Sequence, residues 1–131
     1  MKPLMEMLLV AGGGALGAMS RFAIHVTAEK FSKVEFPVGT FAANMIGCLL
    51  IGVLLGSGRG ESSQAWRLAF GIGFLGSLTT FSTFSAETVS CVNDGATGVA
   101  IANIAANVLV GLIAVVVGIW IGRSLAPVVE V

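Results

Sequence analysis

The sequence predicts an all-α membrane protein with four transmembrane helices, the third of which is broken in the middle of the membrane. Three observations support this class. The 131 residues are 56% hydrophobic and only 11% charged, with a mean hydropathy of +0.97, whereas a soluble domain carries about 25% charged residues. The chain contains four uncharged runs, at residues 7–20, 36–58, 68–86 and 95–122. The third run is interrupted by GSLTTFSTFS at 76–85, a sequence poorly suited to a continuous helix.

The four runs account for the chain as one transmembrane domain, residues 1–131. We expect helices at about residues 4–27, 37–56, 65–92 and 97–123, with a polar loop at 29–35. Three of the runs reach the ~18 residues that a spanning helix needs, and the first must extend past Arg21 to cross. Short connections leave no room for a soluble catalytic domain. We therefore expect neither an enzyme nor a nucleic-acid-binding protein.

The first expected helix carries two glycines four residues apart, a spacing suited to close helix packing. An apolar segment after Lys2 is also compatible with a cleavable signal peptide, but the glycine pair favours a retained helix. Similar pairs occur in the second and fourth helices. The three pairs are Gly13 with Gly17, Gly52 with Gly56, and Gly118 with Gly122. Near the end of the first helix, Arg21 either extends to the membrane interface or lines an entrance for anions.

Pairs of polar residues mark the second and fourth expected helices. Thr40 and Asn44 are four residues apart and therefore share a helical face, as do Asn103 and Asn107. A single intramembrane Asn more often bonds to a neighbouring helix than forms a site. Two such pairs beside a broken helix favour a polar track.

The break near residues 76–80 of the third helix indicates a transport site. No water in the bilayer core can satisfy a broken backbone, so such a break must be buried in protein or line a path. It also frees backbone carbonyls near Gly76 and Thr79. A cation bound between two symmetry-related breaks would satisfy these carbonyls and hold a dimer together.

The polar groups at membrane depth favour an anion. A cation carrier would normally need a carboxylate at depth, and the sequence predicts none there, because Glu6 and Glu87 flank the apolar runs. Phe81 and Phe84 are three apart and share a face. Their positive ring edges would stabilise an anion weakly, although plain packing is the alternative for both. The expected donors are Thr40, Asn44, Ser82, Thr83, Ser85 and, if it faces the path, Arg21.

Positive charges divide almost equally between the two ends of the expected helices. Lys2, Arg59, Arg67 and Arg123 belong to the end that holds the N-terminus, and Arg21, Lys30 and Lys33 belong to the other. A membrane protein usually orients with the end that has more Lys and Arg in the cytoplasm, and here neither end has a clear excess. We therefore expect insertion in both orientations and an antiparallel, dual-topology homodimer within the lipid bilayer.

The two cysteines, Cys48 and Cys91, form no CxxC pair. We expect both to be small buried hydrophobic residues, since neither has the spacing of a metal ligand.

Three segments resemble the bacterial Fluc fluoride channels, the CrcB family. They are GGALGAMSRF at 13–22, GTFAANMIG at 39–47 and GSLTTFSTFS at 76–85. Their order and spacing match over the whole chain, and TTFSTF is highly specific. The resemblance implies a four-helix antiparallel dimer with two fluoride pores in the plasma membrane, the bacterial inner membrane. It also implies passive export that lowers fluoride inside the cell, where HF that crosses the bilayer ionises.

The resemblance also implies roles for single residues. Phe81 and Phe84 would supply the family's phenylalanine box, and Asn44 would be the pore amide. Gly76 and Thr79 would offer carbonyls to a structural sodium ion at the dimer interface. Arg21 matches the motif arginine, and Thr40 and Ser82 match hydroxyls in or near the pore. The chain departs from the pattern at Ser77, where members often have Gly, and at Asn103 and Asn107, where many have Tyr and then Ser.

Two alternatives to a fluoride-selective channel remain open at this point. A small dual-topology multidrug exporter has a similar length, but it would need a glutamate embedded in the first helix, and Glu6 stands at the helix entrance. A non-transporting scaffold subunit would explain the glycines, but it would leave the hydroxyl-rich break as an unexplained cost.

Overall fold

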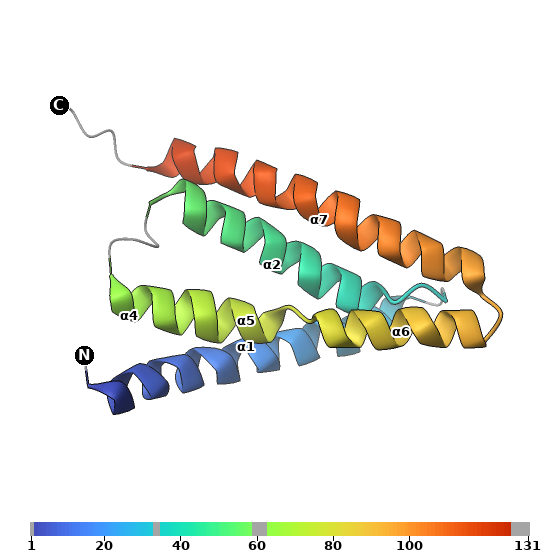
Figure 1. Cartoon of the computed structure of the whole chain (residues 1–131), viewed down its shortest axis with the longest axis horizontal. Helices are drawn as coiled ribbons and strands as arrows, with labels where there is room; N and C mark the ends of the chain where they lie inside the picture. Colours follow the sequence, from blue (N-terminus) through green and yellow to red (C-terminus); the bar gives the residue numbers. More distant parts are fainter. Residues whose placement is uncertain (1, 33–34, 59–62, 127–131) are drawn as a thin grey trace.

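A computed structural model describes residues 2–32, 35–58 and 63–126, and its described elements are all helices. Four lengths of chain run up and down beside one another, so that both termini lie at the same end (Figure 1). They are α1 (Pro3–Phe31), α2 (Val38–Gly56), the segmented stretch from Gln64 to Asn93, and α7 (Thr97–Leu125). Each is long and apolar enough to cross a membrane. The prediction of four spans is confirmed.

The first helix is longer than predicted, because it continues through residues 29–31, where the sequence predicts a loop. His25 Nε2 lies 3.2 Å from Glu29 Oε1 one turn later, and Lys30 in the last turn complements the helix dipole. The helix ends where the Ser32 N–H donates to the Ala28 carbonyl. Local side-chain pairing therefore extends the helix beyond its apolar part.

The third length of chain consists of four helical segments. They are α4 (Gln64–Trp66), the π-helix η1 (Arg67–Leu75), α5 (Gly76–Leu78) and α6 (Phe81–Asn93). Between α5 and α6, Thr79 has φ −89° and ψ 154°, and Thr80 has φ −152° and ψ 117°. Both residues are thus extended. The Thr80 hydroxyl accepts a hydrogen bond from the Thr83 N–H at 3.2 Å, which caps the start of α6.

The sequence does not predict the π-helix. In η1 and the turn before it, the rings of Trp66, Phe70 and Phe74 stack with centroids 4.9 and 5.3 Å apart. Wider π-type turns are rare and occur mostly as short insertions, frequently near functional sites. Here the π-helix leads directly into the short α5 and the extended pair of threonines.

Glycines set the close packing of the helices. A Cβ added to Gly52 of α2 would overlap the carbonyl oxygen of Val115 in α7, and one added to Gly118 would overlap the carbonyl of Leu49. The other glycines of the three predicted pairs make equally close approaches, namely Gly13, Gly17, Gly56 and Gly122. The first two press α1 against η1 and α5. This geometry agrees with the prediction that these glycines are packing residues.

The interior is small and the exterior is strongly apolar. Leu54, Leu75 and Leu78 form the buried cluster, while large apolar side chains such as Leu109 and Ile113 of α7 are exposed. An apolar exterior suits a lipid solvent.

The expectation for the cysteines is met only in part, and two of the charges used to predict topology cannot be placed. Cys48 and Cys91 are free, but each is half-buried and not fully buried. Of the charges used to predict dual topology, Lys33 and Arg59 lie outside the described residues.

Candidate functional site

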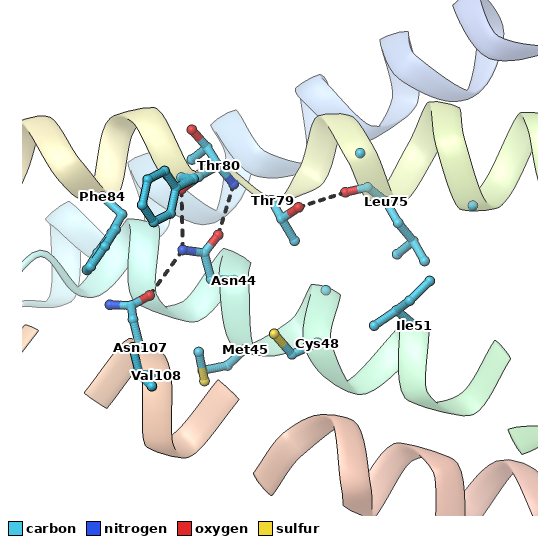
Figure 2. A pocket seen from close by; sticks show the side chains of 14 residues that line it. Asn44, Met45, Cys48, Ile51, Leu75, Thr79, Thr80, Phe84, Asn107 and Val108 are labelled. Carbon is cyan, nitrogen blue, oxygen red and sulfur yellow. Dashed lines mark hydrogen bonds between the residues drawn. The ribbon is translucent and has the colours of Figure 1, made fainter. Parts of the chain in front are cut away.

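The α5–α6 junction opens into a groove of about 450 Å³ that is lined by α2, the third length of chain and α7 (Figure 2). Its polar lining comes from Asn44, Thr79, Thr80 and Asn107. The rest of the lining is apolar or glycine, and consists of Met45, Gly47, Cys48, Ile51, Gly71, Leu75, Gly76, Phe81, Phe84 and Val108. The groove therefore brings together six of the residues that the sequence singles out, from three different lengths of chain. These six are Asn44, Gly76, Thr79, Phe81, Phe84 and Asn107.

Asn44 bridges the extended segment and α7. Its Oδ1 accepts the Thr80 N–H at 2.9 Å, and its Nδ2 donates to the Thr80 carbonyl at 3.4 Å and to Asn107 Oδ1 at 3.1 Å (Figure 2). The helical partner of the Thr80 N–H would be a carbonyl four residues earlier. The Asn44 amide replaces that partner, so the extended backbone keeps its hydrogen bond without a helix.

The two phenylalanines lie at the start of α6, with ring centroids 5.6 Å apart and planes inclined at 49°. Phe84 is half-buried and points into the groove, close to Asn44 and Asn107 (Figure 2). The Phe81 side chain is 80% exposed. Within a single chain, therefore, the Phe84 ring is partly covered and the Phe81 ring is not.

Hydroxyl groups cluster around the start of α6. Thr80 Oγ1 lies 3.3 Å from Ser82 Oγ and donates to Thr83 Oγ1 at 3.0 Å. Ser85 Oγ donates to the carbonyl of Phe81 at 2.8 Å, which satisfies that hydroxyl within the helix. Ser82 contacts Thr80, which lines the groove, but Ser82 itself does not line it.

A second cavity of about 260 Å³ lies on the α1 side of the junction. Arg21, Thr40, Thr80 and Thr83 line it, together with Ala18, Phe22, His25 and Gly39. Thr80 is therefore common to the groove and to this cavity. The structure places Arg21 and Thr40 in this cavity and not with the phenylalanines.

Glu87, which directly follows the third uncharged run, is hydrogen-bonded to α2. Glu87 lies inside α6, and its Oε1 accepts a hydrogen bond of 2.8 Å from Thr40 Oγ1, a side chain that is 4% exposed. Its Oε2 is buried and has no hydrogen-bond partner among the described residues. Glu87 follows Thr83 by four residues and so shares its helical face, a signal in the sequence that identifies the residue.

The two asparagines of α7 have different surroundings. Asn107 lines the groove, whereas Asn103 is 1% exposed and does not. Asn103 Nδ2 donates to Thr88 Oγ1 at 2.8 Å, and its Oδ1 accepts from Asn107 Nδ2 at 2.9 Å. Asn103 therefore links α7 to α6 and also holds the Asn107 side chain.

The break in the third length of chain changes the hydrogen bonding of two backbone carbonyls, those of Gly76 and Thr79. Among the described residues, no turn, cap or side-chain hydrogen bond reaches the carbonyl oxygen of Gly76 or Thr79. The Thr79 N–H and Oγ1 both donate to the Leu75 carbonyl, each at 3.1 Å. Carbonyls freed by broken helices are the groups that coordinate Na⁺ in membrane transporters. No cluster of three or more His, Cys, Asp or Glu side chains suitable for a metal occurs in the part of the chain that the structure describes.

Comparison with known proteins gives consistent similarities. Residues 8–119 match the family described as CrcB-like protein, Camphor Resistance (CrcB). A protein of Dehalococcoides mccartyi named Fluoride-specific ion channel FluC is 43% identical over 122 residues, which cover 92% of this chain and 94% of that protein. A protein of the same name from Acidobacterium capsulatum is 41% identical over 123 residues, or 92% of this chain and 98% of that protein. Fluoride-specific ion channel FluC 2 of Symbiobacterium thermophilum is 43% identical over 119 residues, or 89% and 94%.

Proposed function

The chain belongs to the CrcB-like family, and on that basis we propose that it is a multi-pass channel of a bacterial membrane that lets fluoride leave the cytoplasm. The observation that carries the proposal is 43% identity, over 92% of the chain, to a protein named for fluoride-specific conduction. The groove supports it independently, because it combines amide and hydroxyl groups with aromatic rings at an interrupted helix.

The residues of the groove suit a small anion that must shed water. Fluoride is strongly hydrated, so its path has to replace that shell with groups that bind weakly enough to release it. The Asn44 amide supplies N–H donors, and the edges of Phe81 and Phe84 supply weaker positive potential. The hydroxyls of Ser82 and Thr83 and the Arg21 guanidinium would extend this lining toward the second cavity. The Thr40 hydroxyl donates its proton to Glu87 and would serve there only if that bond opened. An ion channel of this kind is not an enzyme, and neither the groove nor the comparisons favour a multidrug exporter.

The proposal includes an antiparallel, dual-topology homodimer. In a single chain the groove is open, and the Phe81 ring is 80% exposed. A second copy seated on this face would close the groove and cover that ring. The near balance of positive charge between the two ends gives neither orientation an advantage. In such a dimer the extended pair Thr79 and Thr80 would stand near the middle of the bilayer.

A sodium ion at the centre of that dimer fits the donors present. Gly76 and Thr79 line the groove, and among the described residues no turn, cap or side-chain hydrogen bond reaches their carbonyls. Two related chains would offer four such oxygens. When bound, the ion would supply the positive charge that these oxygens otherwise lack. The chain's own contribution is to divert the two N–H groups that a continuous helix would aim at these carbonyls. Asn44 holds the Thr80 N–H, the helical partner of Gly76, and Thr80 Oγ1 holds the Thr83 N–H, the helical partner of Thr79.

Reconstitution into liposomes tests the function directly. Purified protein in vesicles loaded with potassium fluoride should release fluoride to an external electrode once valinomycin compensates the charge. The same vesicles loaded with potassium chloride should retain it. Fluoride release no faster than from protein-free vesicles would refute the channel.

A further inference from the structure

The carboxamides of the groove form one hydrogen-bonded chain with a fixed direction. The Thr80 N–H donates to Asn44, Asn44 donates to Asn107, Asn107 donates to Asn103, and Asn103 donates to Thr88. The Thr88 hydroxyl in turn donates to the carbonyl of Phe84 at 2.7 Å. The chain thus starts at a backbone N–H and ends at a backbone carbonyl, groups whose roles cannot be exchanged. These two ends settle which amide atom is oxygen and which is nitrogen at each step.

This direction commits the amide protons of both groove asparagines. Asn107 Nδ2 donates to the Asn103 carbonyl at 3.0 Å as well as to Asn103 Oδ1. Asn44 Nδ2 donates to Asn107 Oδ1 at 3.1 Å and, over a longer 3.4 Å, to the Thr80 carbonyl. An amide nitrogen carries two protons. An anion in the groove therefore finds neither amide with an uncommitted donor.

Apart from its pairing with Thr80, the Asn44 side chain is hydrogen-bonded to one other residue among those described, Asn107. Asn44 Oδ1 is held by a backbone N–H at 2.9 Å, which fixes the side chain in place. The proton aimed at Asn107 can be released without breaking that bond, because only Asn107 Oδ1 holds it. Asn107 also lines the groove, so an anion there can approach the same proton.

We propose that Asn107 is a positioning residue that competes with the transported anion for the Asn44 amide. This inference rests on the proposed fluoride channel, and it identifies a residue that sets the affinity of that channel for fluoride. In this chain Asn107 Oδ1 occupies the donor whenever fluoride is absent. Fluoride binding must displace it, which weakens binding and speeds release. Asn103 supports the arrangement by keeping Asn107 turned with its oxygen toward Asn44.

The test replaces the competing acceptor and measures fluoride affinity apart from rate. In Asn107→Leu the side chain keeps a similar size but cannot accept a hydrogen bond. The fluoride concentration that half-saturates efflux from liposomes should fall about threefold to tenfold, the equivalent of one neutral hydrogen bond. The shorter Asn107→Ala, which also lacks an acceptor, serves as a second variant with the same expected direction, should Asn107→Leu fail to fold. Leu109→Ala is the matched control, because Leu109 is an exposed apolar residue of the same helix that does not line the groove, and it should leave the half-saturating concentration unchanged.

A second readout does not depend on conduction. The Asn44 side-chain amide signals of ¹⁵N-labelled protein in detergent, assigned through their loss in Asn44→Asp, should shift on titration with sodium fluoride. The midpoint should be about threefold to tenfold lower in Asn107→Leu than in the parent protein. A midpoint that is unchanged or higher in both Asn107 variants, or signals that ignore fluoride, would overturn the inference. Absent efflux from the parent protein would instead refute the channel, while the titration would still decide the role of Asn107.

Discussion

At the scale of single residues, the Asn44 side chain joins α2, the α5–α6 junction and α7, and the two phenylalanines lie beside it. The spacing of Phe81 and Phe84 places both rings at the start of one helix, and the groove contains both. The partner of Asn44 could not be predicted from spacing. Its bond to the Thr80 N–H depends on how α2 and the α5–α6 junction approach in space. The same holds for Thr40 and Glu87, which are 47 residues apart in the chain.

Replacement of either ring by an aliphatic side chain should impair conduction. Phe84→Ile and Phe81→Ile remove the positive ring edge but keep an apolar group of useful size. Fluoride efflux from liposomes should fall about tenfold or more in each variant, while dimers still form on gel filtration. Phe70→Ile is the control, because Phe70 stacks on Trp66 and Phe74 away from the groove. Efflux that is unchanged in both groove variants would remove the phenylalanines from the pore.

The hydrogen bond between Thr40 and Glu87 should contribute to stability. Thr40→Val keeps the shape of the side chain but leaves the buried Glu87 carboxyl without its partner. The free energy of unfolding should fall by about 1–3 kcal/mol, the cost of an unsatisfied buried polar group. Denaturation in detergent measures it. In the Glu87→Leu background the same Thr40→Val change should cost much less, and equal costs in the two backgrounds would show that the pair is not coupled.

At the scale of helices, the sequence predicts which segments are apolar and where the third one is weakest, but not every boundary. The length of α1 exceeds the apolar run because an i, i+4 pair and a terminal lysine extend it. The π-helix has no signature in hydropathy, since its wider turn follows from tertiary packing. Glycine spacing, in contrast, predicts close helix contacts well, because only a missing side chain permits them.

The glycine contact between α2 and α7 should be essential for packing. Gly118→Val would place side-chain atoms on the backbone of α2 at Leu49 and Gly52. We expect a loss of about 3 kcal/mol in the free energy of unfolding, measured in detergent. Gly98→Ala in the same helix is the control, because a Cβ there meets nothing within 4 Å. That change should be neutral or slightly stabilising, and an equal loss in both variants would contradict the packing argument.

At the scale of the whole molecule, the sequence predicts four spans and one domain, and the described residues contain four helical lengths of chain that are long and apolar enough to span a membrane. Orientation in the membrane and assembly with a second copy are not properties of one folded chain. They depend on charge balance during insertion and on the face that the groove leaves open. For this reason dual topology remains a prediction.

Site-directed labelling tests the orientation. In a background with Cys48→Ala and Cys91→Ala, a single cysteine at the exposed Ser63, between α2 and α4, reports one end of the bundle. Impermeant maleimide should label about half of the molecules from each side of the membrane. A cysteine in place of Gln64 should behave in the same way. Labelling from one side only would contradict dual topology and the antiparallel dimer built on it.

A pore at the α5–α6 junction that passes fluoride and excludes larger halides fixes the reversal potential of its current. This potential is measured in a planar bilayer with fluoride on one side and an equal concentration of chloride on the other. We expect a large reversal potential of the sign that fluoride permeation requires, and loss of the current in Asn44→Ala. A reversal potential near zero, or one of the sign that chloride requires, would contradict it.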